Sequence, residues 1–150
     1  MYKKVLVALD GSEQSRKALD HAAAIAEKFG SELTLLTVVP RAMLPFFNGG
    51  GFGSTIDVVQ YQDRCKDIYQ AVLAEAGARV RSEHPGLSVG TMLREGRPSA
   101  AIVDVAENEG YDLIVMGSRG MRGITGWILG STSRRVVNSC TKPVLIIKTS

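Results

Sequence analysis

The sequence has few of the residues that metal centres and disulfide frameworks require. Its 150 residues include two cysteines, Cys65 and Cys140, which form no CxxC pair, and two isolated histidines, His21 and His84. This spacing indicates neither a structural zinc site nor a disulfide framework. We expect Cys65 to be a small core residue on a helix and His84 to be a surface residue in a turn.

Long apolar runs and clustered charge are also missing. No apolar segment is long enough to cross a bilayer, and the first residues lack the pattern of a signal peptide. The net charge is +3, but basic and acidic residues are interleaved, so nucleic-acid binding is a weak alternative. With 45% hydrophobic and 22% charged residues, we expect a single domain over residues 1–150 in the reducing cytoplasm, without membrane attachment.

Recognisable catalytic constellations are absent as well. The sequence has no Ser-His-Asp spacing, no paired carboxylates and no cysteine beside an activating base. Two common phosphate signatures are missing too, because Gly-x-x-x-x-Gly-Lys-Ser/Thr does not occur and Gly-x-Gly-x-x-Gly does not follow the first apolar run. These absences favour a binding protein over a fast enzyme.

Short apolar runs alternate with amphipathic segments along the chain. We predict strands over residues 4–9, 32–39, 87–93, 112–116 and 143–148, and helices after Ser12, from about 56 to 82, after Pro98 and over 134–138. Gly30 is placed to end the first helix in a left-handed conformation. This alternation predicts an α/β fold, a doubly wound parallel sheet of five strands with helices on both faces, in which ligands bind beyond the carboxyl ends of the strands.

Two features of the middle of the chain lead to more specific predictions. Residues 40–56 form a long connection with exposed aromatics and a glycine run, which we expect to be a flexible loop acting as a lid, an interaction surface or a disordered segment. On the following helix we predict an apolar stripe of residues at helical spacing: Tyr61, Cys65, Ile68, Val72, Ala76 and Val80.

A glycine-rich stretch from Met116 to Ser133 is the most informative segment of the sequence. It follows a strand expected to be buried on both faces, and the hydroxyl-bearing residues 131–133 lead into the last helix. Glycines allow backbone amides to approach a ligand closely, and a helix start offers unpaired amides and a positive dipole end. The stretch therefore predicts a phosphate site, with a merely flexible surface loop as the alternative.

The pattern Gly117-x-x-Gly120, nine residues and then Gly130-Ser131 resembles the universal stress protein family, in its ATP-binding branch. The segments Val5–Ser12 and Pro143–Ile147 add to the resemblance, which covers essentially the whole chain. It implies a Rossmann-like strand order of 3-2-1-4-5 and an adenine nucleotide ligand, ATP, with Mg²⁺. The implied binding residues are Ala8, Leu9, Asp10, Val38, Met116, Gly117, Arg119, Gly120, Gly130, Ser131, Thr132 and Ser133.

Within this set, the resemblance implies that Asp10 and the backbone around Val38 hold the adenosine end. The glycines and Ser131 then hold ribose and phosphates, and Arg119 and Arg122 add positive charge. An Asp carboxylate accepts from sugar hydroxyls, whereas amides and hydroxyls donate to phosphate oxygens. Taken alone, Asp10 is more typical of a turn that caps a helix, and the glycine spacing favours the binding role instead.

The implied function is regulatory, in the stress response, with at most weak ATP hydrolysis. Two alternatives stay open: a slow Mg²⁺-dependent ATPase or phosphoryl- or nucleotidyl-transfer enzyme, and a nucleotide-free module that binds a protein partner. The strand Val144–Ile147 is continuously apolar, yet the implied order places it at the edge of the sheet. We therefore predict a homodimer through this strand, with cover by a helix or by the 40–56 loop as the alternative.

Overall fold

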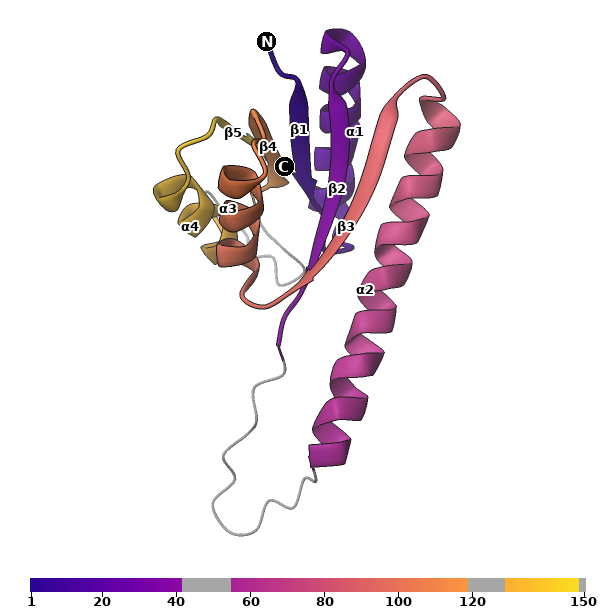
Figure 1. Ribbon diagram of the computed structural model, residues 1–150, viewed down its shortest axis with the longest axis vertical. Coiled ribbons are helices and arrows are strands. Elements are labelled where there is room, and N and C mark those ends of the chain that lie inside the picture. The colour runs from indigo at the N-terminus through magenta and orange to yellow at the C-terminus, as the bar shows by residue number, and fades with distance from the viewer. Residues whose placement is uncertain (42–54, 119–128, 149–150) are drawn as a thin grey trace.

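Five parallel strands form a single sheet in the order β3-β2-β1-β4-β5 (Figure 1). The computed structural model describes residues 1–41, 55–118 and 129–148. Strands alternate with helices along the chain: β1 Lys4–Ala8, α1 Glu13–Phe29, β2 Glu32–Val39, α2 Thr55–Glu83, β3 Ser88–Glu95, α3 Pro98–Asn108, β4 Leu113–Gly117, α4 Ser131–Ser139 and β5 Val144–Ile147. The predicted fold class and strand order are confirmed, and the predicted boundaries differ by at most a few residues.

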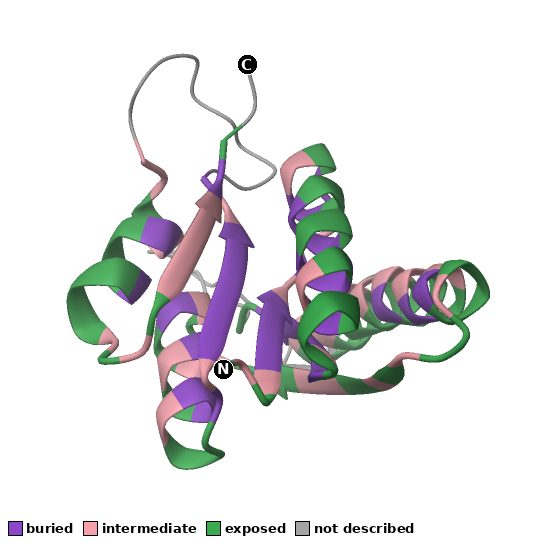
Figure 2. Cartoon of the chain, turned by 90° about the horizontal axis from the view of Figure 1, so that it is seen from above, coloured by how far each residue is buried: buried purple, intermediate pink, exposed green. Residues whose placement is uncertain are grey.

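Helices cover both faces of the sheet, two on each. Apolar side chains of β1, β2 and β4 that point to one face pack against α1 and α2, and those that point to the other face pack against α3 and α4. Because β1 is central, its residues Val5, Leu6 and Val7 are fully buried (Figure 2). This burial explains why the strand is a continuous apolar run rather than an alternating one.

The ends of α1 follow local rules. Ser12 caps the first turn, because its Oγ accepts a hydrogen bond from the amide of Ser15 at 3.1 Å. Gly30 ends the helix with a φ of 66°, the left-handed conformation predicted for it. The small residues between these ends let α1 pack closely on the centre of the sheet.

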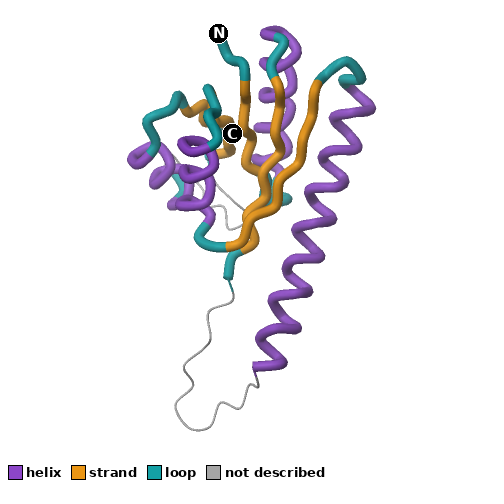
Figure 3. Tube along the Cα trace, viewed as in Figure 1, coloured by secondary structure: helices purple, strands orange, loops and turns teal. Residues whose placement is uncertain are grey.

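The predicted stripe on α2 is wrong at two positions. Tyr61 and Ile68 are 59% and 63% exposed, and Leu73, which the stripe omitted, is 2% exposed. The 29-residue helix is about 43 Å long, whereas the eight residues of β3 span about 26 Å. The amino-terminal part of α2 therefore extends past the described strands, as Figure 3 shows.

The predictions for Cys65 and His84 also need correction. Cys65 is only partly buried, and His84 is not a free surface residue, since its Nδ1 lies 3.1 Å from Oε2 of Glu27 on α1. Most of the predicted 40–56 loop, residues 42–54, lies outside the described residues. The single-domain organisation over 1–150 stays a prediction.

Two carboxylates accept hydrogen bonds near the amino-terminal ends of the strands. Asp112 accepts bonds from the amides of Lys4 and Lys3 at 2.9 Å each, and these bonds lower the pKa of its carboxyl group. Glu107 accepts from the amide and hydroxyl of Thr141, which likewise lowers the pKa of Glu107. The opposite edge, where the strands end, carries the pocket described next.

Candidate functional site

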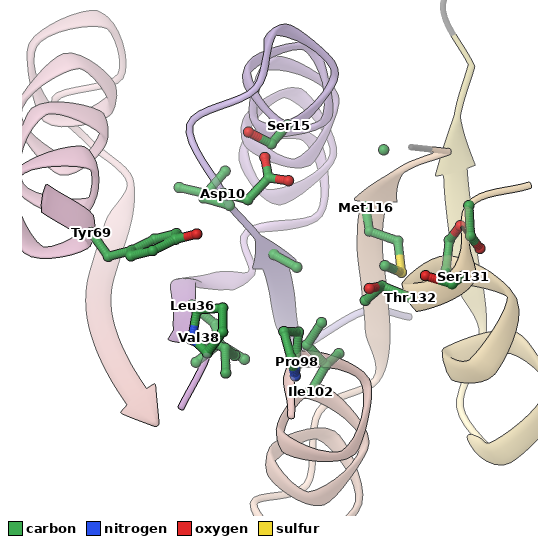
Figure 4. Close-up of a pocket in the computed structure, with 16 residues that line it drawn as sticks. Asp10, Ser15, Leu36, Val38, Tyr69, Pro98, Ile102, Met116, Ser131 and Thr132 are labelled. Atoms are coloured by element: carbon green, nitrogen blue, oxygen red, sulfur yellow. Dashed lines mark hydrogen bonds between the residues drawn. The ribbon is translucent and has the colours of Figure 1, made fainter. Parts of the chain in front are cut away.

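A pocket of about 510 Å³ lies at the carboxyl ends of β1, β2 and β4, where the strand order reverses (Figure 4). Its volume is typical of small-molecule sites, and its position is the usual one for ligands of doubly wound folds. The lining residues come from the three strand ends, from α2 and from the starts of α1, α3 and α4: Ala8, Leu9, Asp10, Ser15, Leu36, Val38, Pro40, Tyr69, Pro98, Ile102, Met116, Gly117, Gly130, Ser131, Thr132 and Ser133.

Ten of the twelve residues predicted from the sequence line this pocket. They are Ala8, Leu9, Asp10, Val38, Met116, Gly117, Gly130, Ser131, Thr132 and Ser133. The other two, Arg119 and Gly120, lie outside the described residues, as does Arg122. Segments more than a hundred residues apart in sequence thus meet at one site, because parallel strands end at the same edge of the sheet.

Asp10 stabilises a turn and also lines the pocket. Its Oδ1 accepts a hydrogen bond from the amide of Ser12 at 2.9 Å, which stabilises the turn before α1. The carboxylate is nevertheless only half-buried and lines the pocket. An ionised carboxylate has about four acceptor positions, so Asp10 keeps acceptor capacity for a ligand.

The start of α4 presents hydroxyls to the pocket. Gly130 is the N-cap, and no side chain of a described residue caps this helix. The amide of Gly130 donates to the carbonyl of Ser118 at 2.7 Å, and Oγ of Ser133 donates to the same carbonyl at 2.9 Å. These two groups hold α4 to the end of β4, and Ser131 and Thr132 of its first turn line the pocket.

Gly117 has a structural reason to be glycine that the sequence did not reveal. A β-carbon at this position would lie 2.8 Å from Cβ of Gln14 and 3.2 Å from its backbone carbonyl carbon. The absence of a side chain therefore lets the first turn of α1 approach the end of β4. This approach brings the starts of α1 and α4 to the same pocket.

Six lining residues were not predicted: Ser15, Leu36, Pro40, Tyr69, Pro98 and Ile102. Leu36, Val38 and Ile102 give one side of the pocket an apolar wall. Tyr69 lies four residues after Cys65 and four before Leu73, so helical spacing alone could have placed it on the inner face of α2. Burial, followed by the negative charge of Asp10, raises the pKa of Tyr69.

Among the described lining residues, charged side chains are few. Asp10 is the only ionisable carboxylate among the described lining residues. In the part of the chain that the structure describes, no three His, Cys, Asp or Glu side chains are grouped to hold a metal ion. None of the described helices is long and apolar enough to cross a membrane.

This fold and pocket define the class: a doubly wound α/β protein with a small-molecule pocket at the switch in strand order. A model of the universal stress protein family matches residues 1–148, and the chain belongs to this family. Universal stress protein YxiE of Bacillus subtilis is 32% identical over 154 aligned residues, which cover 99% of this chain and 100% of YxiE.

Two solved structures are similar and contain nucleotides. A universal stress protein in complex with cAMP is 29% identical with a TM-score of 0.71, and the match covers 99% of each chain. The Archaeoglobus fulgidus universal stress protein in complex with dAMP is 27% identical with a TM-score of 0.62, and the match covers 98% of each chain. Adenine nucleotides are therefore ligands of related proteins.

Proposed function

We propose that this protein binds an adenine nucleotide, ATP in the first place, in the pocket at the ends of β1, β2 and β4, and acts in the cytoplasm as a regulator of the stress response. The observation that carries the proposal is that different parts of this pocket have different chemistry. It joins an apolar wall, a carboxylate and the start of a helix within about 510 Å³. The complexes of related proteins with cAMP and dAMP support the choice of an adenine nucleotide.

Each part of the nucleotide has a matching surface. The adenine ring packs against the apolar wall of Leu36, Val38 and Ile102, where burial of the ring is favourable. The sugar lies beside the Asp10 carboxylate, which accepts from hydroxyls. The phosphates lie at the start of α4, where Ser131, Thr132 and the first-turn amides donate hydrogen bonds and the helix dipole favours negative charge.

Magnesium enters this proposal only with the phosphates. Mg²⁺ commonly keeps several waters and is held by one or two carboxylates together with substrate phosphates. Asp10 is the only described carboxylate in the pocket, so the nucleotide supplies most of the ligands. With one carboxylate and no adjacent base, the described residues offer no group that activates water, which supports regulation by binding rather than by turnover.

Two measurements on the purified full chain test nucleotide binding. The first identifies any nucleotide that is released when gently purified protein is denatured, and the second is a calorimetric titration of the nucleotide-free protein with ATP and GTP. We expect an adenine nucleotide in the released fraction and saturable binding of ATP. Absence of released nucleotide, together with no heat of binding at millimolar ATP, would contradict the proposal and favour a nucleotide-free partner module.

A homodimer through β5 is the second part of the proposal. β5 is an edge strand of the sheet, and the side chains of Val144, Leu145 and Ile146 are only partly buried. An apolar edge strand with unpaired backbone groups favours pairing with another strand, and a two-fold mate supplies the same edge. Ile147 is 7% exposed and belongs to the core of its own chain, so Leu145 is the better position to probe.

Light scattering of wild type and Leu145→Lys at micromolar concentration tests the dimer. We expect a dimeric wild type and a largely monomeric variant, because lysine places a charge at the strand interface. Ser139→Lys, at an exposed position at the end of α4, is the matched control and should stay dimeric. A monomeric wild type would contradict the dimer without affecting the nucleotide proposal.

A further inference from the structure

Tyr69 is the one described residue of α2 that lines the pocket. Its ring extends from the helix, and its hydroxyl points into the pocket on the side of Asp10 (Figure 4). No part of the glycine-rich signature includes this residue. Its position at a polar end of the pocket therefore requires a separate explanation.

The packing of α2 fixes where this hydroxyl lies. Gly11, in the turn after Asp10, has a φ of 86°, and a β-carbon there would lie 3.2 Å from Cγ2 of Val72. The helix is thus packed directly on the turn that carries Asp10. Tyr69 is one helical turn before Val72 and lies on the same face of α2, so its ring stands beside this turn.

Tyr69 and Asp10 differ in hydrogen-bonding capacity. Burial and the nearby Asp10 carboxylate raise the pKa of Tyr69, so its phenol is protonated at neutral pH and both donates and accepts. The Asp10 carboxylate only accepts, and its Oδ1 already accepts from the amide of Ser12. The negative charge of Asp10 disfavours a phosphate at this end, while a neutral hydroxyl can donate to Asp10 and accept from Tyr69.

We propose that Tyr69 and Asp10 form a subsite for the hydroxyls of a ribose ring, and that Tyr69 determines the preference for ribonucleotides over deoxyribonucleotides. The inference rests on the proposed function and adds the sugar class of the ligand. It assigns the two ends of the pocket to two parts of the ligand: the sugar hydroxyls at Tyr69 and Asp10, and the phosphates at α4.

Calorimetric titrations of the full chain with ATP, 2′-deoxy-ATP and 3′-deoxy-ATP test this subsite in wild type, Tyr69→Phe and Tyr61→Phe. Tyr61 is the matched control, because it is on the same helix but is 59% exposed and does not line the pocket. Wild type should bind at least one deoxy analogue about fivefold to tenfold more weakly than ATP, since one hydrogen bond is lost.

The Tyr69→Phe variant should lose this discrimination, because ATP binds about fivefold to tenfold more weakly while the discriminated analogue stays within about twofold of its wild-type affinity. Tyr61→Phe should match wild type. An equal loss for ATP and both analogues, or an unchanged preference, would overturn the inference and leave nucleotide binding standing. The same holds if wild type binds all three equally, whereas failure of wild type to bind any of them would overturn the proposed function itself.

Discussion

The starts of α1 and α4 have nearly the same backbone but different chemistry. Both helices begin just beyond the carboxyl ends of neighbouring strands, and their N-cap residues, Ser12 and Gly130, have φ and ψ of −71° and 159° and of −61° and 161°. Oγ of Ser12 accepts from the amide of Ser15, whereas no side chain in the part of the chain that the structure describes caps α4. Among the described residues, a side chain thus caps the start of α1 but not that of α4.

Charge reinforces this difference. Asp10 precedes α1 and Glu13 lies in its first turn, and both offset the positive end of the helix dipole. The first turn of α4 has no acidic residue, and two hydroxyl-bearing residues, Ser131 and Thr132, face the pocket instead. The start of α4 is therefore the one of the two where the proposed function places the phosphates, because its dipole is not offset by acidic residues of its own first turn.

The largest expected effect is on the contact that brings the two helix starts together. Gly117→Ala places a β-carbon 2.8 Å from Cβ of Gln14 and close to its backbone, so α1 must shift. We expect the free energy of unfolding to fall by about 1–3 kcal/mol in urea denaturation.

Gly90→Ala, in β3, is the matched control for this substitution. Its new β-carbon would have Thr34 Oγ1 at 3.9 Å as its nearest neighbour, an ordinary contact. Alanine is also the better strand residue, so we expect a gain of at most about 1 kcal/mol. Equal stabilities of the two variants would show that the close approach of α1 to β4 is not required.

Two hydroxyls of α4 should differ in how much they contribute to the free energy of unfolding, and this effect is smaller. Ser133→Ala removes a buried hydroxyl that bonds to the carbonyls of Ser118 and Gly130, and should cost about 1 kcal/mol of unfolding free energy. Ser131→Ala removes an exposed hydroxyl and should leave the unfolding free energy within about 0.5 kcal/mol of wild type.

Binding should respond differently in these two variants. We expect Ser131→Ala to weaken the binding of ATP by on the order of 1 kcal/mol, because a phosphate oxygen loses a hydrogen-bond donor. Calorimetry with ATP alongside urea denaturation of both variants measures the contrast. A Ser131→Ala variant with wild-type affinity would remove this hydroxyl from the phosphate site.

The sheet and most of the pocket could be predicted from the sequence because their signatures are local. Buried parallel strands are uninterrupted apolar runs, and the spacing of Gly117, Gly130 and Ser131 marks the loop and helix start. Strand order came from the family resemblance, and it brought Asp10 and Val38 to the same edge. Residues 119–128, which include two predicted positions, lie outside the described residues.

Features that depend on contacts between distant segments could not be predicted in this way. The reason for glycine at Gly117 is Gln14, a residue of another element, and periodicity does not reveal that pair. Tyr61 and Ile68 fit an apolar stripe but are exposed: Tyr61 lies near the start of a helix that is longer than the sheet, and Ile68 is one residue before Tyr69, which lines the pocket. Tyr69 was missed because an aromatic residue on a helix is as typical of a core as of a pocket.

Substitution of Gly130 tests most directly whether the uncapped start of α4 holds the phosphates. Gly130→Asp gives α4 the kind of cap and charge that α1 already has, and the extended backbone of Gly130 suits an N-cap aspartate. Gly130→Ser, which adds a neutral cap, separates the effect of charge from that of capping. Calorimetric titration with ATP and thermal unfolding are measured on all three proteins.

We predict that Gly130→Asp is as stable as wild type or more so, by up to about 1 kcal/mol, and binds ATP more than about tenfold more weakly. Gly130→Ser should fall between Gly130→Asp and wild type in affinity. A folded Gly130→Asp protein that binds ATP with wild-type affinity would contradict the assignment of the phosphates to this helix start.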